Sequence, residues 1–464
     1  MLRAPVTSAT DIRAELGALW KLAGPLAIAS AGWALMGVVD TAVAGRAGPA
    51  VLGGTGLGNG LFFAVTVVGI GITMGLDPLV AQALGAGDRP RARRLLWQGV
   101  WLSLVVSAAL AVPVALLPLA LEPAGVDSAA AVQAGRFLHV RLLGLPAVLL
   151  FTAQRAYLQG FGRTRPLVLA AVLGNLANLP LAALLVFGGS SLPAWTGVLR
   201  RIPPLGSAGS ATATTVVTVL EVALLALATR EPGAAPVDRR PDRQVLRQAL
   251  RVGLPIGLHM AAEVGIFALV GLLAGRLGAV SLGAHQLVLS VATLSFTLAI
   301  GIGNAASVRV GWAVGAGDTP AARRAGLTAF ASAGSAMALA GLAFVLVPGP
   351  LARLFTDDPA VAHEAAALFV VAAVFQISDG LQGSGAGVLR GAGDTRFTFG
   401  ANMVGHWLVG LPVALLLGFG LSLGVRGLWW GLCTGLSVVA GSLLWRFLRL
   451  SRRTIRPLAA AEQA

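Results

Sequence analysis

Long apolar segments separated by short polar stretches run the whole length of the chain. Runs of about 20 apolar residues recur, and each is long enough to cross a hydrocarbon core of about 30 Å as an α-helix. We therefore predict an all-α polytopic membrane protein with twelve transmembrane helices. We place them at about 22–46, 52–80, 96–121, 134–160, 167–188, 207–229, 252–276, 281–310, 326–350, 364–389, 397–419 and 425–447.

The second half of the chain repeats the first. At an offset of 230 residues, Pro255 corresponds to Pro25 and the Gly-Ala-Gly-Asp segment 315–318 corresponds to 85–88. Similarity at a fixed offset indicates a duplicated unit. Because six spans per half is an even number, both halves have the same orientation. We predict two six-helix lobes related by a pseudo-two-fold axis along the membrane normal, with a cavity between them.

Arginines indicate which loops face the cytoplasm, because Lys and Arg are enriched in short cytoplasmic loops. Four arginines lie in the loop 85–95 and five lie in the polar stretch 230–250. We expect an N-terminal lobe at 1–229, a cytoplasmic linker at 230–250, and a C-terminal lobe with a cytoplasmic tail at 251–464. Both termini are predicted to be cytoplasmic, and residues 1–20 to form a short amphipathic lead-in.

Composition supports a membrane protein and excludes several other classes. The chain is 56% hydrophobic and 11% charged, whereas soluble proteins carry about 25% charged residues. The net charge of +15 comes from loop arginines. Because no basic domain or aromatic RNA-binding motif accompanies it, we expect no nucleic-acid partner. The single Cys433 excludes an intramolecular disulfide and a thiolate metal cluster.

Twelve spans in two sets of six favour a secondary transporter that works by alternating access. No Walker-type phosphate loop is present, so we do not expect ATP to drive transport. No nucleophile–base or metal constellation is apparent, so we do not expect an enzyme or a cofactor. The expected partners are the lipid bilayer and small molecules, and the expected state is a monomer.

Three carboxylates fall at depths where a charge is costly. Glu263 lies near the middle of the seventh span, Asp379 midway along the tenth, and Asp40 in the outer half of the first. A charged residue at a helix centre costs about 2.5–3.5 kcal/mol on insertion scales, so each is a functional candidate. These acids could bind a proton, or could hold sodium together with hydroxyl and amide oxygens. A hydrogen-bonded structural acid is the alternative for each. Their repeat counterparts are apolar: Trp33, Val148 and Val270.

Other polar residues are weaker candidates. Asn175 and Asn178 share one face of the fifth span and could line the cavity, although a helix–helix hydrogen bond explains them equally well. The substrate-cavity candidates are Asn175, Asn178, His259, His406 and Gln286. Asp77 and Glu221 lie nearer the cytoplasmic ends, where water is accessible. Asp88 and Asp318 are expected to cap the helices that follow them.

These motifs resemble those of the multidrug and toxic compound extrusion (MATE) family over nearly the whole chain. The matching segments are Gly-Pro at 24–25, Val-Asp-Thr at 39–41, Ala-Gly-Arg at 44–46, Gln82 with Gly-Ala-Gly at 85–87, Glu263, Asp379 with 389–391 and 393–396, Gly-Leu-Pro at 410–412, and Gly-Leu-Trp at 427–429.

The resemblance implies an antiporter that exports amphipathic, often cationic drugs across the bacterial inner membrane in exchange for H⁺ or Na⁺. It further implies that Glu263 and Asp379 form a cation site in the C-terminal lobe and that Asp40 marks one in the N-terminal lobe. Asn178 fits an Asn of some members, but the Asp that follows it by four residues is Ala182 here, and His406 replaces a common Tyr. A lipid-linked oligosaccharide flippase of the same superfamily is the alternative.

Overall fold

The computed structural model describes residues 12–190 and 193–459. In these residues, twelve helical segments are long and apolar enough to cross a membrane, which confirms the predicted fold class and number of spans. The N-terminal lobe contains α1 (Ile12–Arg46), α2 (Pro49–Thr73), α3 (Leu76–Gly85), α4 (Arg89–Leu121), α5 (Ser128–Gly160), α6 (Arg165–Phe187), the short 3-10 helix η1 (Ala194–Arg201) and α7 (Ser207–Ala228). Together, α2 and α3 make one span.

The C-terminal lobe repeats this plan, with one irregular span. Its first helices are α8 (Arg243–Arg276), α9 (Ala279–Gly315), α10 (Thr319–Leu346), the short α11 (Pro348–Arg353) and α12 (Pro359–Ala392). The eleventh span consists of α13 (Thr395–Asn402), η2 (Met403–Gly410), α14 (Leu411–Leu415) and η3 (Leu416–Gly420), and α15 (Gly424–Leu450) is the last. Both η2 and η3 are π-helical, a conformation that occurs frequently at functional sites.

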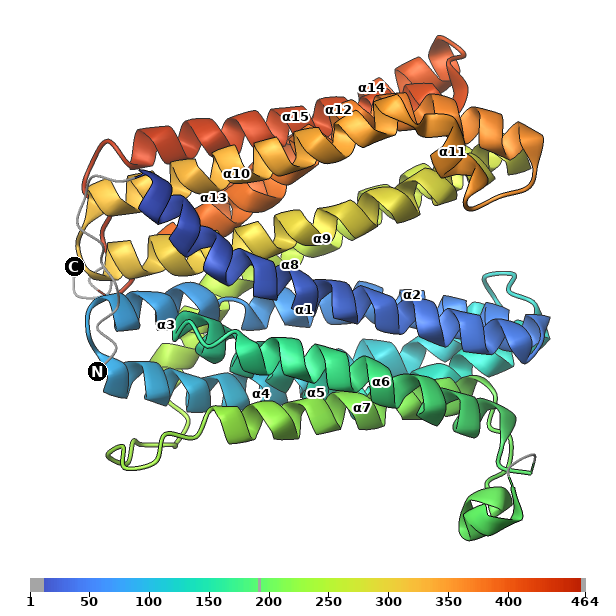
Figure 1. The fold of residues 1–464 in the computed structure, drawn as a ribbon, viewed down its shortest axis with the longest axis horizontal. Helices are drawn as coiled ribbons and strands as arrows, with labels where there is room; N and C mark the ends of the chain where they lie inside the picture. The colour runs from blue at the N-terminus through green and yellow to red at the C-terminus, as the bar shows by residue number, and fades with distance from the viewer. Residues whose placement is uncertain (1–11, 191–192, 460–464) are drawn as a thin grey trace.

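The two lobes lie together at the end of the bundle where α4 and α10 begin and α7 ends (Figure 1). We call this the linker end. From there the lobes diverge toward the opposite end, where α11 and η1 lie. Two buried ion pairs join the lobes near the linker end: Arg309 of α9 donates to Glu15 of α1 at 2.6 and 2.5 Å, and Arg390 of α12 lies 3.4 Å from Asp77 of α3.

Close backbone contacts join the lobes as well, and they follow the repeat. A Cβ at Gly71 of α2 would lie 2.4 Å from the Cα of Gly257 in α8, and a Cβ at Gly301 of α9 would lie 2.6 Å from Ala27 in α1. Positions 71 and 301 are repeat counterparts, as are 27 and 257, so the two helix crossings are equivalent. Small residues at these points allow the helices to approach closely.

Two helix starts differ from the sequence prediction. Helix α1 is already formed at Ile12, the first described residue, and its first turns are held by Leu19 in the core and by the pair of Glu15 with Arg309; residues 1–11 of the predicted lead-in lie outside the described part. Helix α8 begins at Arg243, inside the segment assigned to the linker, because Asp242 caps it by accepting from the backbone N–H groups of residues 244 and 245. The predicted caps at Asp88 and Asp318 are also present.

We expect Gly71→Ala to lower the free energy of unfolding by about 1–3 kcal/mol, because the added methyl group collides with the backbone of α8. Gly60→Ala is the matched control, because Gly60 lies in the same helix and a Cβ there meets no atom within 4 Å. Unfolding in SDS titrations measures both variants. Equal stability of the two variants would contradict the close contact.

Candidate cation and substrate site

A cavity of about 580 Å³ lies between the lobes. Its walls come from α1, α2, α5 and α6 of the N-terminal lobe and from α8, α9, α12 and α13 of the C-terminal lobe. Most of the lining side chains are apolar. Ligand pockets typically measure about 300–1,000 Å³ and combine apolar walls with a few polar groups, so this cavity has the size and character of a site for one small molecule.

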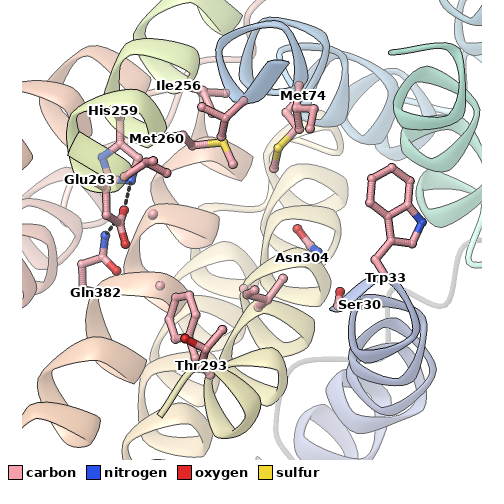
Figure 2. Close-up of a pocket in the computed structure, with 18 of the residues that line it drawn as sticks. Ser30, Trp33, Met74, Ile256, His259, Met260, Glu263, Thr293, Asn304 and Gln382 are labelled. Atoms are coloured by element: carbon pink, nitrogen blue, oxygen red, sulfur yellow. Dashed lines mark hydrogen bonds and ion pairs between the residues drawn. The ribbon is translucent and has the colours of Figure 1, made fainter. Parts of the chain in front are cut away.

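Aromatic rings line both walls of the cavity: Phe267, Phe296 and Phe375 belong to the C-terminal lobe, and three more belong to the wall formed by the N-terminal lobe. Trp33, Phe63 and Phe151 line it, and the rings of Trp33 and Phe151 lie 5.1 Å apart in a tilted arrangement. Figure 2 shows Trp33 on the side of the cavity opposite Glu263 and Gln382. The indole Nε1 of Trp33 is buried without a hydrogen-bond partner. The rings of this wall can stack a flat ligand.

The wall formed by the C-terminal lobe is acidic. Glu263 Oε2 accepts a hydrogen bond from Gln382 Nε2 at 3.3 Å and lies 3.4 Å from His259 Nε2. The spacing of four residues between His259 and Glu263 places both on one face of α8. Asp379 also lines the cavity and receives no hydrogen bond from the described residues, and the charge of Glu263 acts on it. Two carboxylates therefore face one apolar cavity without a cationic side chain bound to either.

These acids can bind a positively charged ligand or ion. An unpaired charge in an apolar interior is costly, and a bound cation removes that cost. The oxygens of Glu263, Asp379 and Gln382 suit a proton or a hard metal ion such as sodium, because hard cations prefer oxygen ligands. Arg390 and Arg155 line the same cavity, but Arg390 is held by Asn304 at 2.8 Å and by Asp77.

Asp40 forms a separate cluster inside the N-terminal lobe, and it does not line the cavity. Its side chain is buried and accepts a hydrogen bond from Asn178 of α6 at 2.8 Å and another from Thr214 of α7 at 2.6 Å. The guanidinium of Arg141 acts on Asp40 through charge and lies over the ring of Phe62 at 4.5 Å. The cluster thus connects α1, α6 and α7 around one carboxylate.

Of the five residues proposed from sequence to line the substrate cavity, His259 does so in this conformation. Asn175 instead donates to the carbonyls of Gly32 and Ala171 at 2.9 and 2.8 Å, which is the helix–helix hydrogen bond considered as its alternative. Asn178 belongs to the Asp40 cluster. His406 is buried beside Phe267, with ring centroids 6.5 Å apart, and Gln286 is exposed.

Gln382, Thr214 and Trp33 belong to the sites but are not among the residues predicted from the sequence. Gln382 follows Asp379 by three residues, so helical spacing could have identified it. Trp33 is the repeat counterpart of Glu263, and its role becomes visible only when the two lobes face each other. Nothing in the sequence distinguishes Thr214 from the other threonines of α7, because its contact with Asp40 depends on how three helices pack.

Comparison with known proteins gives consistent matches. A family model described as MatE matches residues 25–184 and 255–416. The chain is 36% identical to multidrug resistance protein NorM of Burkholderia vietnamiensis over 437 residues, which cover 92% of each chain. It is 35% identical to multidrug resistance protein PmpM of Pseudomonas aeruginosa over 462 residues, which cover 97% of this chain and 95% of the relative.

Solved structures show the same fold. A crystal structure of a eukaryotic MATE transporter matches with a TM-score of 0.83 at 24% identity, over 95% of this chain and 98% of that one. An outward-facing multidrug resistance MATE family transporter of the MOP superfamily matches with a TM-score of 0.84 at 20% identity, over 95% of this chain and 97% of that one. The likeness extends over nearly the full length of each chain.

Thr214→Val should lower the free energy of unfolding by about 1.5–3 kcal/mol if Asp40 is charged, because valine keeps the shape of threonine but removes a hydrogen bond to the carboxylate. Thr212→Val in the same helix is the control, since the hydroxyl of Thr212 bonds only to the carbonyl of Ala208. Unfolding in SDS compares the two variants at several pH values. If Thr214→Val loses no more stability than Thr212→Val at any of these pH values, Thr214 does not stabilise the cluster through Asp40.

Proposed function

Because the chain belongs to the MATE (MatE) family of multidrug efflux antiporters, we propose that it exports amphipathic cations through the cavity between its lobes. The exchange partner is an inward-moving H⁺ or Na⁺, and no other cofactor takes part. The names of the NorM and PmpM relatives describe multidrug resistance proteins, and their similarity extends over more than nine-tenths of this chain. These relatives do not favour the flippase alternative.

The observation that carries this proposal is one apolar cavity lined by aromatic rings and two carboxylates, in which Glu263 lies on the side opposite Trp33 (Figure 2). A flat apolar ring can stack against Trp33 and Phe151, while a positive charge on the same molecule faces Glu263 and Asp379. Stacking and cation–π contacts to tryptophan do not require a particular shape of ligand. The cavity therefore suits a class of molecules, amphipathic cations, better than one specific compound.

Competition for the acids couples the two movements. A proton or sodium ion that neutralises Glu263 and Asp379 removes the charge that attracts the drug, so binding of the ion favours drug release. A ligand shifts a conformational equilibrium only by its difference in affinity for the two states. One elementary charge moving inward contributes about 2.3 kcal/mol per 100 mV of membrane potential, which can drive the cycle.

The twelve spans and the bacterial relatives make the chain a multi-pass protein of the inner membrane. We place the linker end in the cytoplasm, with both termini, because the arginine-rich loops lie there. The lobes are packed together at this end, so the structure corresponds to an outward-facing state. The protein contains the whole cavity within one chain, which supports a functional monomer.

Transport in reconstituted vesicles tests the proposal. Vesicles that contain the protein and an ethidium-like dye receive either a pH gradient or a sodium gradient. We expect dye movement against its own gradient with one of the two ions, and that result identifies the coupling ion. If neither the pH gradient nor the sodium gradient drives dye movement, the antiport mechanism is contradicted.

Glu263→Gln and Asp379→Asn should each abolish gradient-driven dye export while leaving the amount of folded protein unchanged, because each removes one charge from the cation site. Glu364→Gln is the control, since Glu364 is a half-buried acid of α12 that lies outside the cavity and pairs with Arg426 at 3.0 Å. Export by the control should equal that of the wild type. Normal export by both site variants would exclude these acids from coupling.

Trp33→Ala should weaken binding of an aromatic cation by roughly 1–2 kcal/mol, because it removes the ring that faces the acids. Trp101→Ala removes a more exposed indole on α4, which does not line the cavity, and should leave binding unchanged. Dye fluorescence titrations of the purified variants measure the difference. If both variants bind alike, Trp33 is not part of the drug site.

A further inference from the structure

Glu221 is a buried carboxylate that belongs to neither of the sites described above. It lies on α7, its side chain is 3% exposed, and neither of its oxygens has a hydrogen-bond partner. A Cβ at Gly174 of α6 would lie 2.5 Å from Glu221 Oε1, so the carboxylate packs directly against the backbone of α6. The expected contact with water near the cytoplasmic end is absent here, because α6 covers the side chain.

The repeat identifies the position in the C-terminal lobe that corresponds to Glu221. The fifth spans of the two lobes match at an offset of 231, so Gly174 corresponds to Gly405. The last spans match at an offset of 218, where the segment 205–209 corresponds to 423–427. Gly206 and Gly424 in these segments both have a positive φ, of 58° and 60°. Glu221 therefore corresponds to Val439.

Val439 shows what packing alone requires at this position. A Cβ at Gly405 would lie 2.3 Å from Val439 Cγ2, just as a Cβ at Gly174 would lie 2.5 Å from Glu221. Val439 is fully buried and fills the same space between the same pair of helices. An apolar side chain is thus sufficient for the fold. A carboxylate in its place is costly in an apolar interior and indicates a function.

The unpaired polar atoms around Glu221 indicate what this part of the lobe binds. Where α6 and α7 pack, Asn175 Oδ1, Asn178 Oδ1 and both oxygens of Glu221 are buried without a hydrogen-bond donor. These four atoms are acceptors; the hydroxyls of Ser210 and Thr215 on α7 and two nitrogens of Arg141 are also buried without a partner. A buried acceptor without a partner costs about 1–3 kcal/mol, more when it is charged. A proton on the carboxylate removes the charge and supplies a donor.

We propose that Glu221 is a second proton-binding carboxylate of the N-terminal lobe, which receives its proton from Asp40 and releases it at the linker end. This inference rests on the proposed antiport and specifies the proton as an ion of the N-terminal lobe. In the transfer, the O–H bond on Asp40 breaks, an O–H bond on Glu221 forms, and Glu221 then gives the proton to water.

Helix α7 places a hydroxyl group between the two acids, although neither oxygen of Glu221 bonds to it in this conformation. Thr214, which donates to Asp40, precedes Glu221 by seven residues, so the two lie on one face of the helix about 10 Å apart. Thr218 lies between them, and its hydroxyl donates to the carbonyl of Thr214 at 2.8 Å. Hydroxyl groups both donate and accept, and can therefore relay a proton. Glu221 is also seven residues from the end of α7 at Ala228, which places it on the linker side of Asp40.

No charged neighbour compensates Glu221. Helix α7 packs against α5 and α6, and less extensively against α1 and α2. Neither carboxylate oxygen hydrogen-bonds to any titratable group of these helices. Those groups are Arg13, Glu15, Lys21, Asp40 and Arg46 on α1, Arg136, His139, Arg141, Arg155 and Tyr157 on α5, and Arg165 on α6.

Carbodiimide labelling of the wild-type protein in vesicles tests the protonation directly. A hydrophobic carbodiimide adds the O–H of a protonated carboxyl group across one of its C=N bonds and does not react in this way with a carboxylate. Glu221 is the only side-chain carboxyl group in the tryptic peptide 202–230, so mass spectrometry assigns the label without ambiguity. We expect labelling of this peptide at low pH that declines as the pH rises. Absent or pH-independent labelling would overturn the proposal.

Two variants test whether the proton at Glu221 takes part in transport. Glu221→Val installs the residue of the C-terminal lobe, and Glu221→Gln keeps the shape of the side chain without the titratable group. Both should bind the dye like the wild type, whereas proton-driven export should slow by about tenfold, equivalent to about 1.4 kcal/mol in the barrier. Normal proton-driven export by Glu221→Val would overturn the relay.

The two kinds of failure can be distinguished. If the wild-type protein does not exchange dye for any ion, the proposed function fails, whatever the labelling result. If the wild type exchanges dye for protons and peptide 202–230 is not labelled, the proposed function stands and the assignment of Glu221 fails. Dye export driven by sodium alone, with no proton movement, would also overturn the relay.

Discussion

The cost of an unpaired charge in an apolar interior governs how this protein is built. Where charges hold the structure together they are paired: Glu15 with Arg309, and Asp77 with Arg390. The acids of the cavity and Glu221 lack such a cationic partner. Removing one member of a buried pair strands the other, so paired charges stabilise one arrangement of the lobes. An unpaired acid is stabilised by any cation that binds to it. This makes such acids suitable for coupling cation binding to drug release.

The two lobes share a backbone plan and differ in side chains at the positions that carry function. Equivalent glycines bring α2 against α8 and α1 against α9. On this symmetric frame, Trp33 of one lobe faces the cavity where its counterpart Glu263 faces it from the other. In the same way, Glu221 occupies a place that Val439 fills in the second lobe. The duplication thus gives two lobes with the same backbone arrangement. Substitutions at a few positions give each lobe a different set of polar and aromatic side chains.

The contacts at the linker end determine how the cavity can open to the other side. The glycine crossings and both inter-lobe ion pairs lie on this half of the molecule, so an inward-facing state must separate all of them. The free energy lost when these contacts separate has to be offset by new contacts at the opposite end and by the difference in ligand affinity between the two states. A ligand with equal affinity for both states does not shift the equilibrium, so the proposed antiport requires the acids near mid-membrane to bind cations unequally in the two states.

The sequence alone determined the twelve spans and the repeat, and it predicted the depth of Glu263, Asp379 and Asp40, because hydropathy and spacing are properties of the chain read in order. Only the tertiary structure decided which side chains meet. Asn178 and Thr214 converge on Asp40, and Gln286 faces away from the cavity, because helix rotation is set by neighbours distant in sequence. For the same reason the sequence suggested that Glu221 meets water, whereas packing of α6 over α7 buries it.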